Sequence, residues 1–352
     1  MNKGLLILTQ KVDLDDEALG FAHGWYAEFA KHFEKVSIIC LFEGRHRLPD
    51  NVHVFSLGKE CGHSRLTYLM RLVRYSFALA SEYQSVFVHM NPIYIILMGP
   101  VWKMLGKNVA LWYAHGHVDL KLRVACSLAD QVFTSTPEGL RLDTPKRRIV
   151  GQGIDTERFR PADSVPADRF TVVTVGRLTR SKGIDMLISA FAVFVRECGD
   201  AAQLLIAGSP VTEQDKKYAE EMRVIVRSSG LGESVRFVGS LRNEEVPRFL
   251  HEGDVFVNAG LTGSLDKAVL EAMAAGLPVI SCNDAVKVQL EGRWPENCVG
   301  KHAREFAAAL SWSYRMGFVR RRAMGLEMSQ FVGSRFGMPG LVERISRQMM
   351  HA

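Results

Sequence analysis

Short apolar runs alternate with helix-like patterns along most of this 352-residue chain. The runs are rich in β-branched residues and bounded by turn residues, which predicts buried strands. In the first half they are Leu5–Thr9, Val36–Phe42, Val52–Leu57, Ser85–Met90, Val109–Ala114 and Gln131–Ser135. In the second half they are Phe170–Gly176, Ala202–Gly208, Val235–Ser240, Val255–Gly260 and Pro278–Cys282. Because helices separate successive strands, the connections are crossovers and the predicted sheets are parallel.

A polar stretch that contains prolines, Asp155–Asp168, separates the two series of strands. The chain is long enough for two domains of ordinary size. We therefore predict an α/β protein with two Rossmann-like domains, 1–157 and 158–334, and a C-terminal helix within 335–352. Ligands bind beyond the carboxyl ends of the strands in open parallel sheets, so we expect the candidate sites to face one cleft between the domains.

Composition and charge limit the kinds of molecule that this protein is expected to bind. Apolar residues make up 47% of the chain and charged residues 23%, which is typical of a folded globular protein. The net charge of +6 is compatible with nucleic acid, an anionic membrane surface or an anionic substrate. No nucleic-acid-binding motif is present, and the aromatic residues are not interleaved with the basic ones. Nucleic acid is therefore not an expected partner.

Two segments bear on membranes. The most apolar stretch, Val86–Leu105, is interrupted by polar residues, glycine and prolines, whereas a membrane span needs roughly 20 mostly apolar residues. A buried strand, a loop and a buried helix are predicted there instead. In His63–Tyr83, apolar residues recur at helical spacing among three arginines. Such a helix is able to lie in an anionic membrane interface, to pack on the sheet with its arginines outward, or to do both.

The expected compartment follows from the N-terminus and the cysteines. The N-terminal apolar run is too short for a signal peptide, and the six cysteines are scattered without a CxxC pair. These features favour reduced thiols in a cytoplasmic protein. The basic charge adds the expectation of peripheral contact with the inner face of the cell membrane.

The stretch Gly260–Ser281 reads as a loop of small residues followed by a helix and a buried strand. Glycines let the backbone approach a ligand closely, and the N-terminus of the helix favours an anion such as a phosphate. Glu271 lies about one turn into this helix, where its carboxylate is able to accept hydrogen bonds from a diol. The pattern predicts a nucleotide-sugar site.

Several segments resemble the retaining, family 4 glycosyltransferases (glycosyl transferases group 1), which have the GT-B fold. In the second half these are LEAMAAGLPVI (Leu270–Ile280), VVTVGRLTRSKGIDMLISAF (Val172–Phe191) and the hinge-like GQGIDTERFRP (Gly151–Pro161). In the first half they are Leu6–Asp13, His89–Pro92 and Leu111–Ala125. The ordered set covers nearly the whole chain. It implies a GT-B fold whose C-terminal helix leans back on the N-terminal domain.

The resemblance implies a site for a UDP- or GDP-sugar, with no metal and no other cofactor. Arg177 and Lys182 would hold the diphosphate next to Gly176, because fixed cations stabilise the charge that develops as the glycosidic bond breaks. Glu271 would accept both ribose hydroxyls. The alternative for each of the three side chains is an ordinary surface or helix-start charge.

One position departs from the family pattern of two glutamates, since Gly263 stands where the upstream glutamate contacts the donor sugar. Either the backbone amides of Ser264 and Leu265, with Asp266 or Lys267, take over recognition of the sugar, or turnover is impaired. Asp266 and Lys267 are also explained as charges at a helix N-terminus.

In the first half, the resemblance places His115 at the donor sugar and Gly20 near the donor phosphates. A histidine there is able to stabilise developing charge without being the nucleophile. Asp16 is a candidate base on the acceptor side or a cap of the following helix. His89, at a strand end, belongs either to the acceptor side or to the core.

The leading hypothesis is a retaining, metal-independent glycosyltransferase that acts on a glycan or lipid-linked acceptor. A non-catalytic partner of another transferase that binds nucleotide sugars is the first alternative, because of Gly263. A nucleotide-sugar epimerase is the second. The nucleotide base, the sugar, the acceptor and the oligomeric state stay open.

Overall fold

The computed structural model describes residues 4–16, 19–163, 168–198, 201–261 and 265–350. The chain divides into two compact units, one of Met1–Gly153 with Met338–Ala352 and one of Ile154–Gly337. The sequence predicted the divisions after residues 157 and 334, a few residues from those of the structure.

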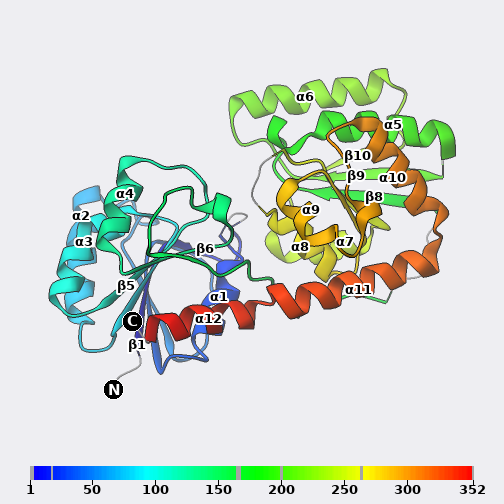
Figure 1. Ribbon diagram of the computed structural model, residues 1–352. Helices are drawn as coiled ribbons and strands as arrows, with labels where there is room; N and C mark the ends of the chain where they lie inside the picture. Colours follow the sequence, from blue (N-terminus) through cyan, green and yellow to red (C-terminus); the bar gives the residue numbers. More distant parts are fainter. Residues whose placement is uncertain (1–3, 17–18, 164–167, 199–200, 262–264, 351–352) are drawn as a thin grey trace. The chain divides into compact units, whose positions relative to one another are not determined.

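Unit 1 contains a seven-stranded parallel sheet with the order β3-β2-β1-β4-β5-β6-β7 (Figure 1). Its strands are β1 (Gly4–Val12), β2 (Lys35–Glu43), β3 (Val52–Ser56), β4 (Ser85–His89), β5 (Asn108–Trp112), β6 (Gln131–Thr134) and β7 (Arg147–Ile149). Its helices are α1 (Ala22–Phe29), α2 (Arg65–Ala78), α3 (Ile93–Met104), α4 (Leu120–Leu128) and α12 (Met338–Met350), with a 3-10 turn at Pro137–Gly139.

Both faces of this sheet are buried, because the crossover helices cover them. One apolar cluster joins the sheet to α1 and α12, and a second joins the other face to α2, α3 and α4. The strands accordingly read as continuous apolar runs rather than as alternating ones.

The C-terminal helix α12 completes the core of unit 1. Leu341, Val342 and Ile345 are fully buried against the sheet and α1. The last turn of a helix leaves carbonyl groups without intrahelical partners. Side chains of the sheet bond two of these carbonyls: Asn108 Nδ2 donates to Met349 O at 2.6 Å and Gln131 Nε2 donates to Gln348 O at 3.0 Å. Both the packing and the helix end therefore tie the C-terminus of the chain to unit 1.

Unit 2 contains a five-stranded parallel sheet with the order β10-β9-β8-β11-β12. Its strands are β8 (Phe170–Val175), β9 (Ala202–Ala207), β10 (Val235–Gly239), β11 (Val255–Asn258) and β12 (Val279–Ser281). Its helices are α5 (Ile184–Cys198), α6 (Glu213–Ser228), α7 (Val246–His251), α8 (Lys267–Ala274), α9 (Asp284–Leu290), α10 (Ala303–Arg315) and α11 (Phe318–Phe336). Short 3-10 turns lie at Arg180–Lys182, Asn243–Glu245 and Pro295–Asn297.

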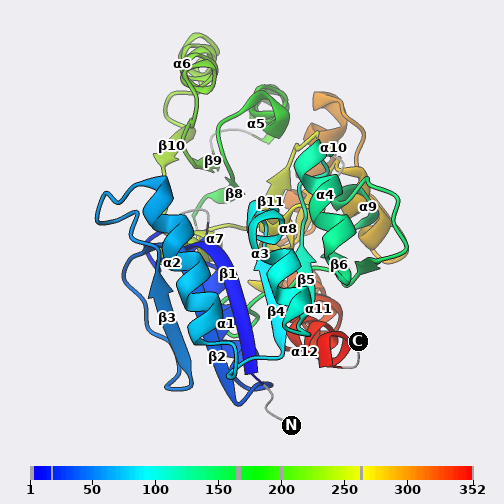
Figure 2. The ribbon, with the colours of Figure 1, turned by 90° about the vertical axis from the view of Figure 1, so that its left-hand side faces the viewer.

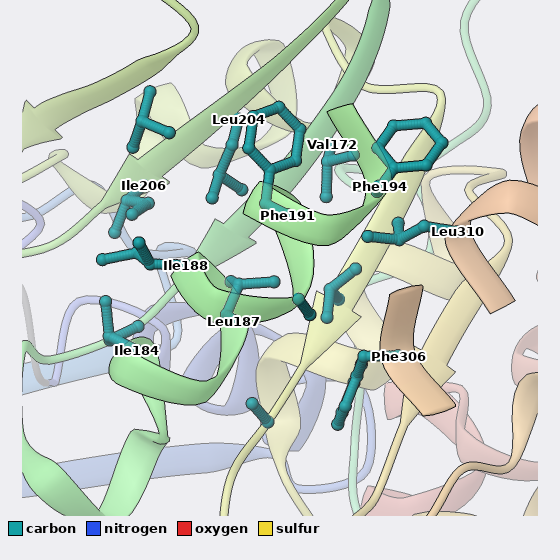
Figure 3. Close-up of a cluster of buried hydrophobic side chains, with 14 of the residues drawn as sticks. Val172, Ile184, Leu187, Ile188, Phe191, Phe194, Leu204, Ile206, Phe306 and Leu310 are labelled. Atoms are coloured by element: carbon teal, nitrogen blue, oxygen red, sulfur yellow. The ribbon is translucent and has the colours of Figure 1, made fainter. Parts of the chain in front are cut away.

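One face of this sheet packs on α5, which presents Phe191 and Phe194 to the strands and to Leu310 of α10 (Figure 3). The other face packs on α8, and α11 lies against α8. Helix α8 is therefore enclosed by apolar groups on most of its surface, which holds its N-terminus at a fixed position at the sheet edge.

All eleven predicted strands are confirmed to within a few residues. The twelfth, β7, was missed because two of its three residues are arginines and it pairs only with β6, so it lacks the apolar pattern of a buried strand. The Val86–Leu105 stretch forms β4, a loop and the 12-residue α3, as predicted. In the described part of the chain, no helix combines the length and apolarity that crossing a membrane requires. Five free cysteines are described, of which Cys61 is exposed.

Replacing Ile345 by alanine is expected to lower the free energy of unfolding by about 2–4 kcal/mol, because the fully buried side chain leaves a cavity between α12 and the sheet. Denaturant titration of the whole chain measures the change. Met350→Ala, at an exposed position of the same helix, is the control and should change stability by less than about 0.5 kcal/mol. Equal effects of the two substitutions would show that α12 does not contribute to the core of unit 1.

Candidate functional site

The candidate donor site lies at the carboxyl ends of β8 and β11 in unit 2. These two strands are neighbours in the centre of the sheet, and the chain continues from β8 toward one edge and from β11 toward the other. Such a switch in strand order leaves a crevice where ligands bind in open α/β sheets. The loop of residues 176–183 follows β8, and residues 259–261 follow β11. The two segments that the sequence selected are therefore brought together by the sheet topology.

Gly183 makes the close contact of these loops possible. Its φ of +63° lies in the left-handed region, and a Cβ there would be 2.4 Å from the carbonyl oxygen of Ala259. The backbone N–H of Leu261 donates to Ser181 O at 2.8 Å, so the loops are also joined by a main-chain hydrogen bond. Only glycine permits this approach at position 183.

Lys182 links the first loop to the start of α8. Its ammonium group forms a short ion pair with Asp266, and both side chains are mostly buried, with exposed fractions of 21% and 11%. Asp266 also accepts from Asn258 Nδ2 at 3.0 Å and, as the N-cap of α8, from the backbone N–H of Ala268. The pair fixes the lysine beside the N-terminus of α8, where the helix dipole adds positive potential.

Glu271 is buried on α8, with an exposed fraction of 9%. Its Oε1 lies 3.1 Å from Lys267 Nζ, one helical turn earlier. The half-buried Arg158 also interacts electrostatically with Glu271. Burial lowers the pKa of the Arg158 guanidinium, and the negative charge of the Glu271 carboxylate is the largest influence that raises it. Glu271 is thus paired with Lys267 at the helix start, and Arg158 supplies a second positive charge in its surroundings.

Arg177 and Arg180 share the loop after β8 but differ in their surroundings. The guanidinium group of Arg180 is already engaged within the protein, because it pairs with Glu221 at 2.7 Å and lies over the ring of Tyr218. Arg177 is exposed and forms no ion pair with any residue that the structure describes. Of the two arginines, Arg177 is the one available to an anionic ligand.

The residues around the missing glutamate are only partly described. Gly263 and Ser264 lie outside the described residues. The side chain of Leu265 is buried in the core, which leaves its backbone as the part that could contact a ligand. Asp266 and Lys267 act as helix-start charges, paired with Lys182 and Glu271 respectively. Both residues thus lie at the start of α8, and their role toward the sugar stays a prediction.

In unit 1, the switch in strand order falls between β1 and β4. Asp16 lies just beyond β1, where it pairs with Lys11 at 2.8 Å and accepts from the backbone N–H of Leu19 at 2.7 Å. Asp16 thus stabilises the turn that precedes α1, but the N-cap of that helix is Phe21, so the alternative interpretation of Asp16 as its cap is wrong. Gly20 is buried in the same turn.

His89 is the last residue of β4, and His115 follows the end of the neighbouring parallel strand β5. His89 is buried against the rings of Phe21 and Trp25, and Met90 after it has a φ of +66°, which non-glycine residues rarely adopt. His115 is exposed and lies edge-on to the ring of Tyr113, with centroids 5.7 Å apart. The structure therefore places His89 in the core at the strand end and His115 at the surface beyond β5.

Two further residues near these sites were not predicted from the sequence. Arg158 belongs to the hinge-like segment Gly151–Pro161, which was assigned a purely connecting role, and its proximity to Glu271 depends on tertiary packing. His23, in the first turn of α1, is buried, and among the described residues its ring nitrogens have no hydrogen-bond partner. Its only sequence signal was a histidine within an apolar helix pattern.

Gly183→Ala is expected to lower the free energy of unfolding by about 1–3 kcal/mol, because it forces a side chain into the left-handed region and against Ala259 O. Denaturant titration tests the stability, and nucleotide titration tests whether the loops still assemble. Gly232→Ala is the control, since a Cβ there meets no atom within 4 Å. If both variants retained the stability of the parent chain, the close approach of the two loops would be disproved.

The buried His23 is expected to make stability depend on pH. Burial lowers its pKa below the usual 6.5, with a smaller contribution from His46. The unfolded chain then binds the proton first, so the free energy of unfolding falls as the pH drops below about 6.5. In His23→Phe the loss of stability between pH 7.5 and 5.5 should be smaller than in the parent chain. A variant with the exposed His117 replaced by phenylalanine should lose as much stability as the parent, and an unchanged loss in His23→Phe would contradict the assignment.

Comparisons with known proteins agree with the geometry of unit 2. Residues 169–315 match the family model of the glycosyl transferases group 1. A GDP-mannose-dependent alpha-(1-6)-phosphatidylinositol monomannoside mannosyltransferase of Mycobacterium tuberculosis is 33% identical over 147 residues, which cover 37% of this chain and 36% of that protein. A mannosylfructose-phosphate synthase of Agrobacterium fabrum is 29% identical over 168 residues, covering 43% and 37%. The matched part thus spans little more than a third of the length of these relatives.

The fold is shared along the whole chain. The crystal structure of HepE from Anabaena, in complex with UDP and glucose, aligns over 100% of both chains with a TM-score of 0.74 at 16% identity. The two sheets and their strand order therefore define a protein of GT-B fold. Its segment 169–315 matches the family model of the glycosyl transferases group 1. The GT-B fold that the resemblance implied is confirmed, and the match in unit 2 agrees with the family that the motifs indicated.

Proposed function

We propose that this protein is a retaining, metal-independent glycosyltransferase that moves a sugar from a nucleoside-diphosphate donor to a glycan or lipid-linked acceptor. The observation that carries the proposal is the assembly of Lys182 and Glu271 at one strand switch point, although 88 residues separate them in the sequence. Asp266 connects them physically, because it pairs with Lys182 and caps the helix that carries Glu271.

The proposed roles follow from charge and burial. Lys182, the exposed Arg177 and the N-terminus of α8 supply the positive potential that a diphosphate requires, and this is our argument for a reaction without a metal ion. Glu271 is buried and acceptor-only when ionised, which suits it to receive two ribose hydroxyls. A ligand that bonds Glu271 would share the carboxylate with Lys267.

The proposed reaction breaks the bond between the anomeric carbon of the sugar and the β-phosphate oxygen of the donor. The acceptor hydroxyl oxygen forms the new bond to that carbon from the same face, so the configuration is retained. Its proton passes to the departing phosphate oxygen, and the nucleoside diphosphate leaves. Arg177 and Lys182 would stabilise the charge on this leaving group, and His115 would contact the donor sugar.

The names of the relatives support a proposal that leaves the nucleotide base and the type of acceptor open. One is described as using GDP-mannose on a phosphatidylinositol monomannoside, one as a mannosylfructose-phosphate synthase, and HepE was crystallised with UDP and glucose. Donors with either base and acceptors of lipid or sugar type therefore occur among proteins similar to this chain. We accordingly propose a UDP- or GDP-sugar as donor and leave the base to experiment.

A non-catalytic protein that binds nucleotide sugars for a partner transferase is the second candidate, because Gly263 replaces a glutamate of the family pattern. It predicts nucleotide binding without turnover when membranes or glycans are supplied as acceptors. An epimerase would instead convert the donor without any acceptor. Assaying labelled UDP- and GDP-sugars with and without acceptor separates the three functions.

Calorimetric titration with UDP and with GDP is expected to show micromolar binding of one of them. Lys182→Ala should weaken this binding roughly 10- to 100-fold, because a charge-assisted hydrogen bond to phosphate is lost. Arg180→Ala is the matched control on the same turn, since Arg180 is engaged with Glu221 and Tyr218. The nucleotide affinity of the Arg180→Ala variant should stay within about twofold of that of the parent chain. Equal binding by Lys182→Ala and the parent chain would overturn the donor site.

A further inference from the structure

The outward face of three neighbouring helices in unit 1 is unusually apolar. Helices α2, α3 and α4 lie side by side on one face of the seven-stranded sheet (Figures 1 and 2). The outer side of such a layer is normally polar, because it faces water. In the described part of the chain, nine of the nineteen exposed large apolar side chains lie on these three helices, which shows how strongly they are concentrated there.

Helix α2 carries most of them. Leu66, Met70 and Phe77 have exposed fractions of 66%, 56% and 52%, and Leu69 and Val73 are also exposed. The spacing of these five residues places them in one stripe along the helix. Of the apolar residues that the sequence assigned to one helix face, only Leu72 is buried on the sheet. Helix α2 is therefore apolar toward the core and apolar again toward the outside.

The neighbouring helices of this layer also expose large apolar side chains. Leu97 and Met104 of α3 are 43% and 87% exposed, and Leu120 and Val124 of α4 are 75% and 38% exposed. We name this surface the outer helix face. Its members are Leu66, Leu69, Met70, Val73, Phe77, Leu97, Met104, Leu120 and Val124.

Positive charge accompanies the outer helix face. Between residues 61 and 130, the segment that contains all three helices, the chain has seven basic and three acidic residues. Two of the acidic residues are paired, Glu82 with Lys35 at 2.7 Å and Asp130 with Lys103 at 3.1 Å. Arg65 and Arg74 are exposed on α2, and Lys121 and Arg123 are exposed on α4. Long basic side chains beside apolar ones are suited to a boundary between anionic headgroups and hydrocarbon.

We propose that the outer helix face docks on the surface of an anionic lipid bilayer. The exposed leucine, methionine and phenylalanine side chains enter the acyl boundary, while the flanking arginines and lysines contact the headgroups. A second copy of the chain would bring the same positive charges face to face, which opposes pairing. The charge pattern therefore favours a lipid surface as the occupant.

This proposal is independent of the donor site, because every residue of the outer helix face belongs to unit 1, whereas Lys182 and Glu271 belong to unit 2. Nucleotide binding measured beside vesicle binding separates a failure of one proposal from a failure of the other.

The test is flotation of the full chain with vesicles of phosphatidylcholine alone and of phosphatidylcholine with 30–40% phosphatidylglycerol, roughly the anionic content of a charged membrane surface. We expect binding to the anionic vesicles only, weakened by salt. Leu66→Gln with Phe77→Gln should reduce the partition coefficient at least about tenfold. Arg65→Gln with Arg74→Gln should also weaken binding and reduce its dependence on salt.

Val211→Gln with Val319→Gln is the matched control, because these two valines of unit 2 are 63% and 79% exposed. It should bind vesicles as the parent chain does. Absence of binding to anionic vesicles, or equal binding by the Leu66 and Phe77 variant, would overturn the proposal. Sedimentation of the parent as a dimer that this variant dissociates, without vesicle binding, would assign the outer helix face to a second copy and overturn it as well.

Discussion

The contact between the loop after β8 and the end of β11 is the constraint on which the candidate donor site depends. Gly183 lets the first loop approach the Ala259 carbonyl, and Lys182 then reaches Asp266 at the start of α8. A side chain at position 183 would separate the two loops. The lysine would then lose its fixed place beside the helix N-terminus, and the charges of the site would no longer converge.

The ion pairs within this site stabilise its buried charges. Lys182 and Glu271 are both mostly buried, and a buried charge without a partner is strongly unfavourable. Asp266 and Lys267 supply the partners and hold both groups in place. A diphosphate and a ribose would meet charged groups that are already positioned, which reduces the ordering that binding requires. Arg177, which is exposed, is the part of the site that would still need to be ordered.

Local pattern accounts for most of what was predicted correctly. Buried parallel strands are continuous apolar runs, so all eleven of those strands were found, while the basic edge strand β7 was not. Arg177, Lys182 and Glu271 were found because glycines and helix starts mark their loops in the sequence. Arg158 escaped notice because its relation to Glu271 exists only after residues more than 100 positions apart are packed together.

The sequence by itself determined the α/β class, the two series of strands and the residue types of the donor site, because these depend on local periodicity and on glycine. Only the tertiary structure decided which charges pair, because the Lys182–Asp266 ion pair joins residues far apart in the sequence that the order of the strands brings together. It also decided which face of α2 is buried. Helical spacing gives the apolar positions of a helix, but the rotation of that helix on the sheet determines whether Leu66 and Phe77 face the core or the outside.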